Sequence, residues 1–260
     1  MQSIAALPLH SRHAVVTGAG RGMGACIAAA LARRGAAVSL LGRTAATLAD
    51  SAERLRSAGA ERVHVQVADV GDEAVLTQAL AACRAALGPV TILVNNAGIA
   101  PSAPFLKSDA ALWQRVLDVD LLGAVHATRA TLPDMLAAQW GRVVNIASTA
   151  GLTGMAYVSA YCAAKHALIG FTRALAMETA RKGVTVNAVC PGYTDTDIVG
   201  DALANIAAKT GRSRDEALAS LVAHNPQGRL VDPEEVAETV AWLCSDAAIS
   251  VTGQSIVLAG

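Results

Sequence analysis

The chain has 260 residues, 53% of them hydrophobic and 16% charged, and its 21 basic and 21 acidic residues give zero formal charge. This length and this apolar content suit one large α/β domain, which we expect to span residues 1–260. A neutral chain without a basic block is a poor candidate for binding nucleic acid or an anionic membrane surface.

The cysteines and histidines give no sign of a metal centre or a disulfide framework. Five cysteines are widely scattered without a Cys-x-x-Cys pair, and six histidines form no ligand cluster. The N-terminus lacks a basic start followed by an apolar stretch, and no run of about 18 apolar residues suggests a membrane span. We therefore expect a cytoplasmic protein with reduced thiols, no bound metal and no membrane partner.

Seven short, largely apolar runs alternate with longer helical stretches from end to end. Such runs are typical of parallel strands that are covered by helices on both faces. The alternation predicts an α/β fold, a doubly wound Rossmann-type three-layer sandwich with a seven-stranded parallel sheet. The predicted strands are His13–Thr17, Ala37–Leu41, Val63–Val67, Ile92–Asn95, Val143–Ile146, Val184–Val189 and Ser255–Leu258.

The segments between these runs carry helix signals. Gly24–Arg34 and Thr44–Ser57 are rich in Ala and Leu, with polar residues at helical spacing. Gly35 is placed to end the first of these helices. Near the C-terminus, Asp232 followed by a proline and two glutamates predicts the capped start of a helix over Val236–Cys244.

The first predicted strand runs into a glycine-rich turn over Gly18–Gly24, which precedes an Ala-rich helix. Glycines let the backbone turn sharply and approach a pyrophosphate, whose charge lies at the amides of the helix N-terminus. A glycine-rich turn alone is a weak signal because tight turns use glycine anyway. Between the first strand and the first helix, however, it favours dinucleotide binding over a purely structural turn.

The end of the second predicted strand bears on the choice of nucleotide. NAD sites usually have an acid there that bonds the ribose 2′-hydroxyl, whereas this chain has Gly42 followed by Arg43. Arg43, assisted by Arg21 in the glycine turn, would pair with a 2′-phosphate. The alternative is that both arginines are solvated. We expect NADP(H), with NAD(H) as the alternative cofactor.

Tyr161 and Lys165 lie one turn apart in a predicted helix, so both side chains share a face. A phenol with a pKa near 10 is a poor acid–base catalyst at neutral pH, and a neighbouring cation lowers that pKa. On its own this spacing usually marks an exposed helix face, so the surrounding motifs decide its meaning.

Together these motifs resemble the short-chain dehydrogenase/reductase family over essentially the whole chain. The glycine turn, the Asn-Asn-Ala-Gly run after the fourth strand and the Tyr-x-x-x-Lys pair all match, and Ser148 precedes Tyr161 by the family's thirteen residues. The matched positions are Thr17, Gly18, Gly22, Gly24, Asp69, Val70, Asn95–Gly98, Ser148, Tyr161, Lys165, Pro191, Gly192, Thr194 and Thr196.

The resemblance implies a nicotinamide-dependent enzyme that interconverts a ketone and a secondary alcohol. Tyr161 is then the general acid/base, Lys165 binds the nicotinamide ribose and lowers the tyrosine pKa, and Ser148 holds the substrate oxygen. The implied cofactor residues are Gly18, Arg21, Gly22, Met23, Gly24, Arg43, Asp69, Val70, Asn96, Gly98, Tyr161, Lys165, Pro191, Thr194 and Thr196.

One position departs from the family pattern. The family commonly has an Asn before a Leu-x-Gly in the helix after the fourth strand, where this chain has Asp120. That Asn is thought to hold a water in the proton relay to the lysine. An ionised Asp accepts hydrogen bonds but donates none, and it adds charge near Lys165. Asp120 is therefore a fourth candidate catalytic residue, and the four-residue relay stays open.

Substrate contacts are expected from loops beyond the carboxyl ends of the strands. The candidate loops are Pro101–Phe105, Thr149–Tyr157 and the segment 197–226, which is a candidate lid. Three cations of that segment either meet an anionic group of the substrate or form a solvated face. These cations are Lys209, Arg212 and Arg214, and the candidate substrate residues are Ser148, Met155, Tyr157 and Tyr193.

Within the resembled family, Gly141–Ser148 and Lys182–Gly192 are most similar to 3-oxoacyl reductases, polyketide ketoreductases and 3-hydroxyacyl or 3-hydroxybutyrate dehydrogenases. We therefore expect a substrate of the 3-oxoacyl/3-hydroxyacyl type. An NAD-dependent secondary alcohol or sugar-alcohol dehydrogenase is the alternative. A noncatalytic nucleotide-sensing protein is the alternative of another class, disfavoured by the intact Ser-Tyr-Lys set.

The predicted helices within Leu112–Met135 and Ser159–Arg181 carry more apolar surface than one face of a sheet covers. The resembled family usually pairs these helices between subunits. We therefore expect a homotetramer, or at least a dimer.

Overall fold

A computed structural model describes residues 7–196, 199–200, 203–204, 211–223 and 225–260. At its centre is a parallel sheet with the strand order β3-β2-β1-β4-β5-β6-β7, which confirms the predicted doubly wound seven-stranded sheet. The fifth and sixth strands are longer than predicted because Gly141 pairs with Val184 and Pro191 pairs with Leu258. The strands are β1 (His13–Thr17), β2 (Ala37–Gly42), β3 (Val63–Val67), β4 (Ile92–Asn95), β5 (Gly141–Ile146), β6 (Val184–Pro191) and β7 (Ser255–Leu258).

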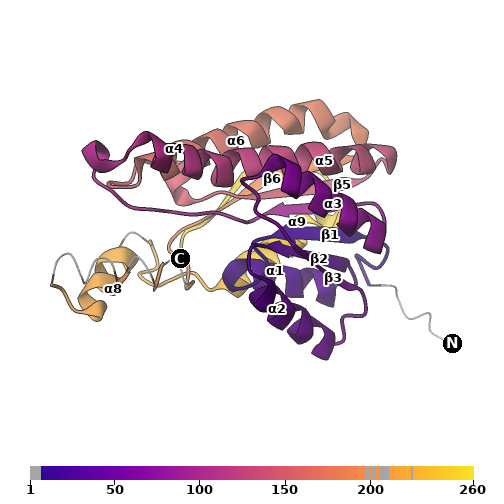
Figure 1. The fold of residues 1–260 in the computed structure, drawn as a ribbon, viewed down its shortest axis with the longest axis horizontal. Helices are drawn as coiled ribbons and strands as arrows, with labels where there is room; N and C mark the ends of the chain where they lie inside the picture. The colour runs from indigo at the N-terminus through magenta and orange to yellow at the C-terminus, as the bar shows by residue number, and fades with distance from the viewer. Residues whose placement is uncertain (1–6, 197–198, 201–202, 205–210, 224) are drawn as a thin grey trace.

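Helices cover both faces of the sheet because successive strand residues point to opposite sides. The longer described helices are α1 (Gly22–Arg33), α2 (Ala45–Ser57), α3 (Glu73–Leu87), α4 (Ala110–Leu117), α5 (Gly123–Ala137), α6 (Ser159–Thr179), α8 (Arg214–Val222) and α9 (Pro233–Leu243). In β1, Val16 belongs to a core shared with α1, α2 and α9, whereas Val15 belongs to a core shared with α3, α5 and α6. Figure 1 shows α5 and α6 on one side of the sheet and α1 and α2 on the other. Of the helices described, none is long and apolar enough to cross a membrane.

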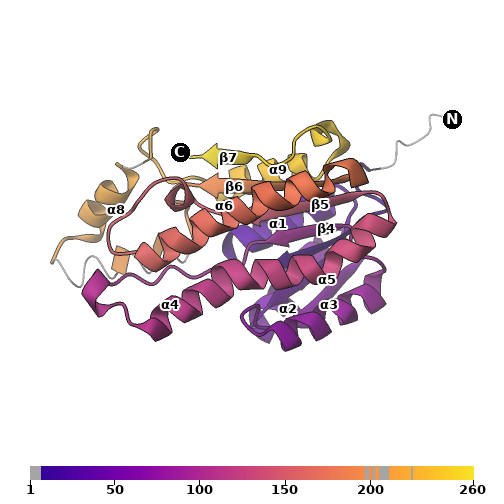
Figure 2. The ribbon, with the colours of Figure 1, turned by 90° about the horizontal axis from the view of Figure 1, so that it is seen from above.

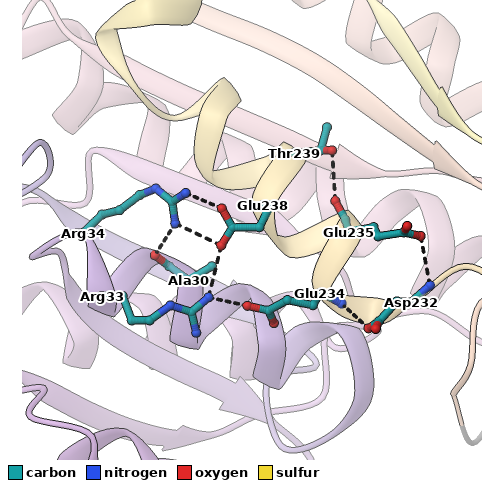
Figure 3. A network of polar contacts seen from close by, with 8 residues as sticks. All are labelled: Ala30, Arg33, Arg34, Asp232, Glu234, Glu235, Glu238 and Thr239. Atoms are coloured by element: carbon teal, nitrogen blue, oxygen red, sulfur yellow. Dashed lines mark hydrogen bonds and ion pairs between the residues drawn. The ribbon is translucent and has the colours of Figure 1, made fainter.

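Helices α1 and α9 lie side by side and are joined by charged residues, as Figure 3 shows. Arg33 and Arg34 at the end of α1 both bond Glu238 of α9, and Arg33 also bonds Glu234. These side chains are largely solvent-exposed, so the network orients the two helices without adding much stability. The predicted start of α9 is confirmed, because Asp232 accepts a hydrogen bond from the Glu234 N–H and forms a capping box with Glu235.

A π-helical turn, η2 (Asp118–Leu122), joins α4 to α5. Such turns interrupt α-helical pitch and often occur at functional sites. Within the turn, Asp120 is only 2% exposed, whereas Leu122 two residues later is 37% exposed. The turn therefore points a carboxylate into the protein.

Only part of the candidate lid 197–226 lies within the described residues, and Lys209 lies outside them. Its described part contains α8, which begins with a capping box and stands out from one end of the molecule in Figures 1 and 2. Arg212 and Arg214 are exposed. An apolar cluster, separate from the main cores, attaches α8 to the loop after β6. Its members are Val199, Leu203, Ala217 and Leu221, with Tyr193, Leu218 and Leu230 packed against them.

Buried His13 in β1 is expected to make the stability depend on pH. Its Nδ1 donates to the Gly88 carbonyl at 2.7 Å, and its Nε2 lies 2.8 Å from the Ser39 hydroxyl oxygen. Burial lowers the pKa of His13 below 6.5, although the bond to Gly88 raises it. The unfolded chain therefore binds a proton that the folded chain excludes, and the free energy of unfolding should fall as pH drops below about 6.5.

Urea unfolding at about pH 7.5 and about pH 5 checks this expectation, with His13→Gln as a variant that is neutral at both values. The wild type should lose more stability between the two pH values than the variant. An equal loss would contradict the assignment to His13.

Candidate active site

A cavity of about 390 Å³ opens beyond the carboxyl ends of the adjacent strands β1 and β4. The helices that follow these two strands cover opposite faces of the sheet, and this change leaves a crevice in which doubly wound folds bind nucleotides. The walls come from the glycine turn, the ends of β2 and β3, and the loop after β4. The predicted cofactor residues that line the cavity are Gly18, Arg21, Gly22, Met23, Gly24, Arg43, Asp69, Val70, Asn96, Gly98 and Thr196.

The glycine turn brings bare backbone to the cavity wall. A Cβ on Gly24 would lie 2.2 Å from the Gly18 carbonyl oxygen, so no side chain fits there. Asn96 Nδ2 donates to the Thr17 carbonyl at 2.9 Å, and the Thr17 hydroxyl accepts from the Asn96 and Ala97 N–H groups, each at 3.0 Å. These bonds hold the turn against the end of β4. The unobstructed backbone at the start of α1 fits a pyrophosphate.

The end of β2 forms the border of the cavity. Arg43 is exposed there, and among the described residues it has no hydrogen-bond or ion-pair partner. Thr44 and Thr47, which were not predicted as site residues, line the same border, and the Thr47 hydroxyl donates to the Thr44 carbonyl at 3.1 Å. The sequence did contain a signal for these two threonines: a helix begins directly after β2, and helix N-termini attract anions. A guanidinium beside hydroxyls and a helix start fits a phosphate group.

A buried ion pair adjoins the cavity on the side of the loop after β4. Lys165 Nζ lies 3.2 Å from Asp120 Oδ1, and the two side chains are 4% and 0% exposed. The lysine also donates to the Ile146 carbonyl at 2.9 Å, and the Ile99 N–H donates to Asp120 Oδ2 at 3.2 Å. A Cβ on Gly98 would lie 2.7 Å from Asp120 Oδ1, so this glycine lets the loop touch the pair. The pair thus joins α6, β5 and η2 beside the cavity.

The two partners of this pair change each other's pKa. Burial lowers the pKa of Lys165, but Asp120 and Tyr161 outweigh it, so the net direction is upward. Burial raises the pKa of Asp120 against the lowering effect of Lys165. Lys165 is therefore a cation at neutral pH.

Tyr161 lies one turn from Lys165 on α6, with the lysine Nζ 5.5 Å from the centre of its ring. Burial raises the pKa of Tyr161, Lys165 lowers it, Asp120 raises it and a hydrogen bond with Ser148 lowers it. Lys165 lowers the pKa of Tyr161 as expected, but burial raises it by more, so the net shift of this pKa is upward. The phenol therefore carries its proton at neutral pH.

Ser148 follows β5 and begins the 3₁₀ turn η3 (Thr149–Gly151), where its hydroxyl accepts from the Ala150 N–H at 3.1 Å. Because Lys165 is bonded to the last carbonyl of β5, the end of this strand and α6 are held together. The fold thus brings Ser148, Tyr161 and Lys165 to one place, with Asp120 behind the lysine.

The remaining predicted residues lie around this group. Tyr157 is 66% exposed and has φ +69°, an unfavourable conformation for a non-glycine residue, and its carbonyl accepts from the Ala103 N–H at 2.8 Å. That bond joins the two candidate substrate loops. Met155 is partly buried, and Tyr193 packs on the cluster around α8. Pro191 ends β6 and Thr194 is buried, and neither lines the cavity.

A glycine-lined cavity next to a buried Lys, with a Tyr and a Ser close to that Lys, is the arrangement expected of an oxidoreductase that uses a nicotinamide dinucleotide. No three His, Cys, Asp or Glu side chains gather as a metal site in the part of the chain that the structure describes. Residues 12–207 match the model of the short chain dehydrogenase family. The chain belongs to this family, the NAD(P)-dependent short-chain dehydrogenases/reductases that act on CH–OH groups, as predicted.

Similar proteins match almost the whole chain. It is 42% identical over 250 residues to cis-4-hydroxycyclohexanecarboxylate dehydrogenase of Sinomonas cyclohexanicum, covering 96% of this chain and 95% of that protein. It is 38% identical over 246 residues to D-beta-hydroxybutyrate dehydrogenase of Cupriavidus necator, covering 94% and 95%. A solved structure of an actinorhodin polyketide ketoreductase variant with NADPH has a TM-score of 0.92 and 37% identity, covering 96% of each chain.

Proposed function

We propose that this enzyme interconverts 3-oxoacyl and 3-hydroxyacyl-type compounds with NADP(H), using Ser148, Tyr161 and Lys165. The observation that carries the proposal is the buried Lys165, held by Asp120 beside the Tyr161 ring and next to a glycine-lined cavity. A lysine in this position has a defined task, which is to stabilise negative charge on the neighbouring phenol.

When bound, the nicotinamide supplies a hydride to the carbonyl carbon or accepts one from the carbinol carbon. In the reduction direction, the Tyr161 hydroxyl donates its proton to the substrate oxygen, and the Ser148 hydroxyl donates a hydrogen bond to the same oxygen. Lys165 stabilises the phenolate that remains. In oxidation these groups act in reverse. Because the pKa of Tyr161 is raised, the proton is in place for reduction at neutral pH.

The substrate class is inferred from the similar proteins and from the surroundings of the site. Two of those proteins are named for a hydroxybutyrate and a polyketide. Near the candidate substrate loops, Phe105, Leu152 and Tyr157 are 67%, 43% and 66% exposed, and apolar side chains of this kind suit an aliphatic chain beside the carbonyl.

A second candidate is a secondary alcohol on a carboxylated ring. It is favoured by the 42% identity to the protein named for cis-4-hydroxycyclohexanecarboxylate. The catalytic group is the same for both candidates, because both substrates present one CH–OH carbon.

A substrate panel tests the proposal. Acetoacetyl-CoA, 3-hydroxybutyrate, cis-4-hydroxycyclohexanecarboxylate and a sugar alcohol would each be assayed with both nicotinamide cofactors in the matching redox state. We expect the highest kcat/KM for acetoacetyl-CoA with NADPH. Higher efficiency with the cyclic alcohol would establish the second candidate, and turnover of none of these compounds would contradict both.

The cofactor preference leads to a prediction for Arg43. Its guanidinium, which has no partner among the described residues, suits the 2′-phosphate of NADPH, and no carboxylate at Gly42 repels that group. We expect NADPH to exceed NADH in kcat/KM by about tenfold, the lower end of the range for a charge-assisted pair because the border is exposed to solvent. Arg43→Ala should remove this preference mainly through KM.

Saturation curves with each cofactor measure the effect, and Gly42→Asp provides the opposite change. A Cβ at residue 42 would lie 3.3 Å from Cδ2 of buried Leu48, so the substitution requires Leu48 to shift by a few tenths of an ångström. It should shift the preference towards NADH. Equal or better wild-type efficiency with NADH would show that Arg43 does not meet the phosphate.

We also propose a homotetramer, because α6, α9 and the C-terminal segment expose large apolar side chains. Met177 on α6 is 84% exposed on one side of the sheet, while Trp242 on α9, Ile249 and Val257 on β7 are 42%, 63% and 49% exposed elsewhere. Such exposed apolar side chains favour contacts between copies, which we expect to close into a tetramer. Light scattering at micromolar concentration should give four times 26.4 kDa, and the monomer mass would contradict the proposal.

A further inference from the structure

We propose that Asn225 is a positioning residue that holds the loop Gly192–Thr196 in place to receive the nicotinamide half of the cofactor. The inference depends on the proposed function in one respect, which is that this loop meets that half. Asn225 follows α8 and precedes α9, and it matches none of the motifs that identify the family.

The side chain of Asn225 pairs with the backbone of Tyr193 at both of its polar atoms. The Tyr193 N–H donates to Asn225 Oδ1 at 3.1 Å, and Asn225 Nδ2 donates to the Tyr193 carbonyl at 3.0 Å. The same Nδ2 donates to the Arg229 carbonyl at 2.7 Å. One carboxamide therefore ties the loop after β6 to the segment that leads into α9.

These bonds are shielded from water, because Asn225 is only 4% exposed. The contact is also close: a Cβ on Gly192 would lie 2.6 Å from Asn225 Oδ1. Truncation of the carboxamide removes the acceptor of the Tyr193 N–H, and movement of the loop would let that group find another partner. A buried backbone group left without a partner favours such movement.

The loop extends this connection to the cofactor cavity. After Tyr193, Thr194 forms a parallel β-bridge with Val231, and the Asp195 N–H donates to the Val231 carbonyl at 3.0 Å. Thr196 then lines the cavity, where a Cβ on Gly22 would lie 3.6 Å from its methyl group. The position of Thr196 thus depends on a loop that Asn225 fixes at its start.

The loop lies on the catalytic side of the cavity. It continues β6, which pairs with β5, and Ser148 stands just beyond the end of β5. Arg43 lies instead at the end of β2, four strands from β6 in the sheet order. A shift of the loop should therefore weaken contacts with the nicotinamide half and spare those with the adenosine half.

Two ligands separate positioning from general loss of structure. NADP⁺ has both halves, whereas 2′-phospho-ADP-ribose lacks the nicotinamide. In calorimetric titrations, Asn225→Ala should raise the Kd of NADP⁺ about tenfold, the effect of losing one to two buried hydrogen bonds, and leave the Kd of 2′-phospho-ADP-ribose within about twofold. The matched control is Gln227→Ala, an exposed residue of the same turn, which should change neither Kd.

Asn225→Asp gives a second readout with almost no change in shape. Its carboxylate would face the carbonyl oxygens of Tyr193 and Arg229 without a proton to donate, and a protonated carboxyl regains the donor. The surrounding charged groups are the Arg229–Glu235 ion pair, Asp232, Asp195 and the terminal carboxylate of Gly260, which lies against Asn225 Nδ2. Relative to wild type, its Kd for NADP⁺ should therefore improve as pH falls from about 8 to about 5.5.

The inference would be overturned if Asn225→Ala raised the Kd of both ligands equally, or if it left the Kd of NADP⁺ unchanged. A pH-independent defect in Asn225→Asp would also count against it. If the wild type binds NADP⁺ but turns over none of the substrates, the proposed function fails while the role of Asn225 stands. If the wild type binds neither NADP(H) nor NAD(H), both fail together.

Discussion

Replacing Tyr161 with Phe is expected to lower kcat by about 10²- to 10⁴-fold, the usual contribution of a general acid/base. The substitution removes only the hydroxyl, so the ring keeps its place on α6 beside Ala160 and Ala164 in a small apolar core. Ser148 and Lys165 remain, but neither carries a proton placed to replace that of the phenol. Steady-state assays in both reaction directions would measure the loss.

Cofactor binding provides the internal control for this variant. NADPH affinity should stay within severalfold, which shows that the fold and the cavity are intact. At exposed Tyr157, a candidate substrate residue, the same substitution removes no proton donor, so it should act through KM and leave kcat within about threefold. If Tyr161→Phe retained a third of the wild-type rate, Tyr161 would not be the acid/base.

Replacing Asp120 with Ala is expected to lower the free energy of unfolding by about 3–5 kcal/mol, because it leaves the buried Lys165 ammonium without its counter-charge. The Ile99 N–H loses its acceptor at the same time. The bond from Lys165 to the Ile146 carbonyl compensates only in part. Urea unfolding followed by circular dichroism would measure the change, and a loss below about 1 kcal/mol would contradict a strongly coupled pair.

Asp120→Asn separates charge from hydrogen bonding and places the common family residue in this chain. The amide oxygen still accepts from Ile99, so the loss of stability should be smaller than with Ala. Asp120 raises the pKa of Tyr161, so removing its charge should lower that pKa. In alcohol oxidation, where the phenolate is the base, the rise of kcat with pH should therefore move to lower pH. An unchanged pH profile would mean that Asp120 does not act on Tyr161.

Much of the fold follows from local sequence patterns. The strand positions were predictable because buried parallel strands are almost wholly apolar, and the glycine turn was predictable because Gly24 has no alternative next to the Gly18 carbonyl. The capped start of α9 follows from Asp232 and the glutamates after it. These features depend on residues that are close together in the chain.

The parts of the site that were not predictable depend on contacts between distant segments. The inward orientation of Asp120 results from a π-helical turn, which leaves no periodic signal in the sequence. The pairing of Asn225 with Tyr193 joins residues 32 positions apart. The upward direction of the Tyr161 pKa reflects burial by the folded protein, whereas the sequence displays only the neighbouring lysine.

The strand order also has a consequence for how the chain folds during synthesis. The central strand β1 pairs with β4 through Ala14 and Ile92, so more than seventy residues separate the two partners. Until the ribosome has released β4, one long edge of β1 stays unpaired, and its apolar residues are exposed to other nascent chains. Contacts so distant in sequence form slowly. Chaperone dependence during translation should therefore peak before residue 95 emerges and decline once β4 has docked.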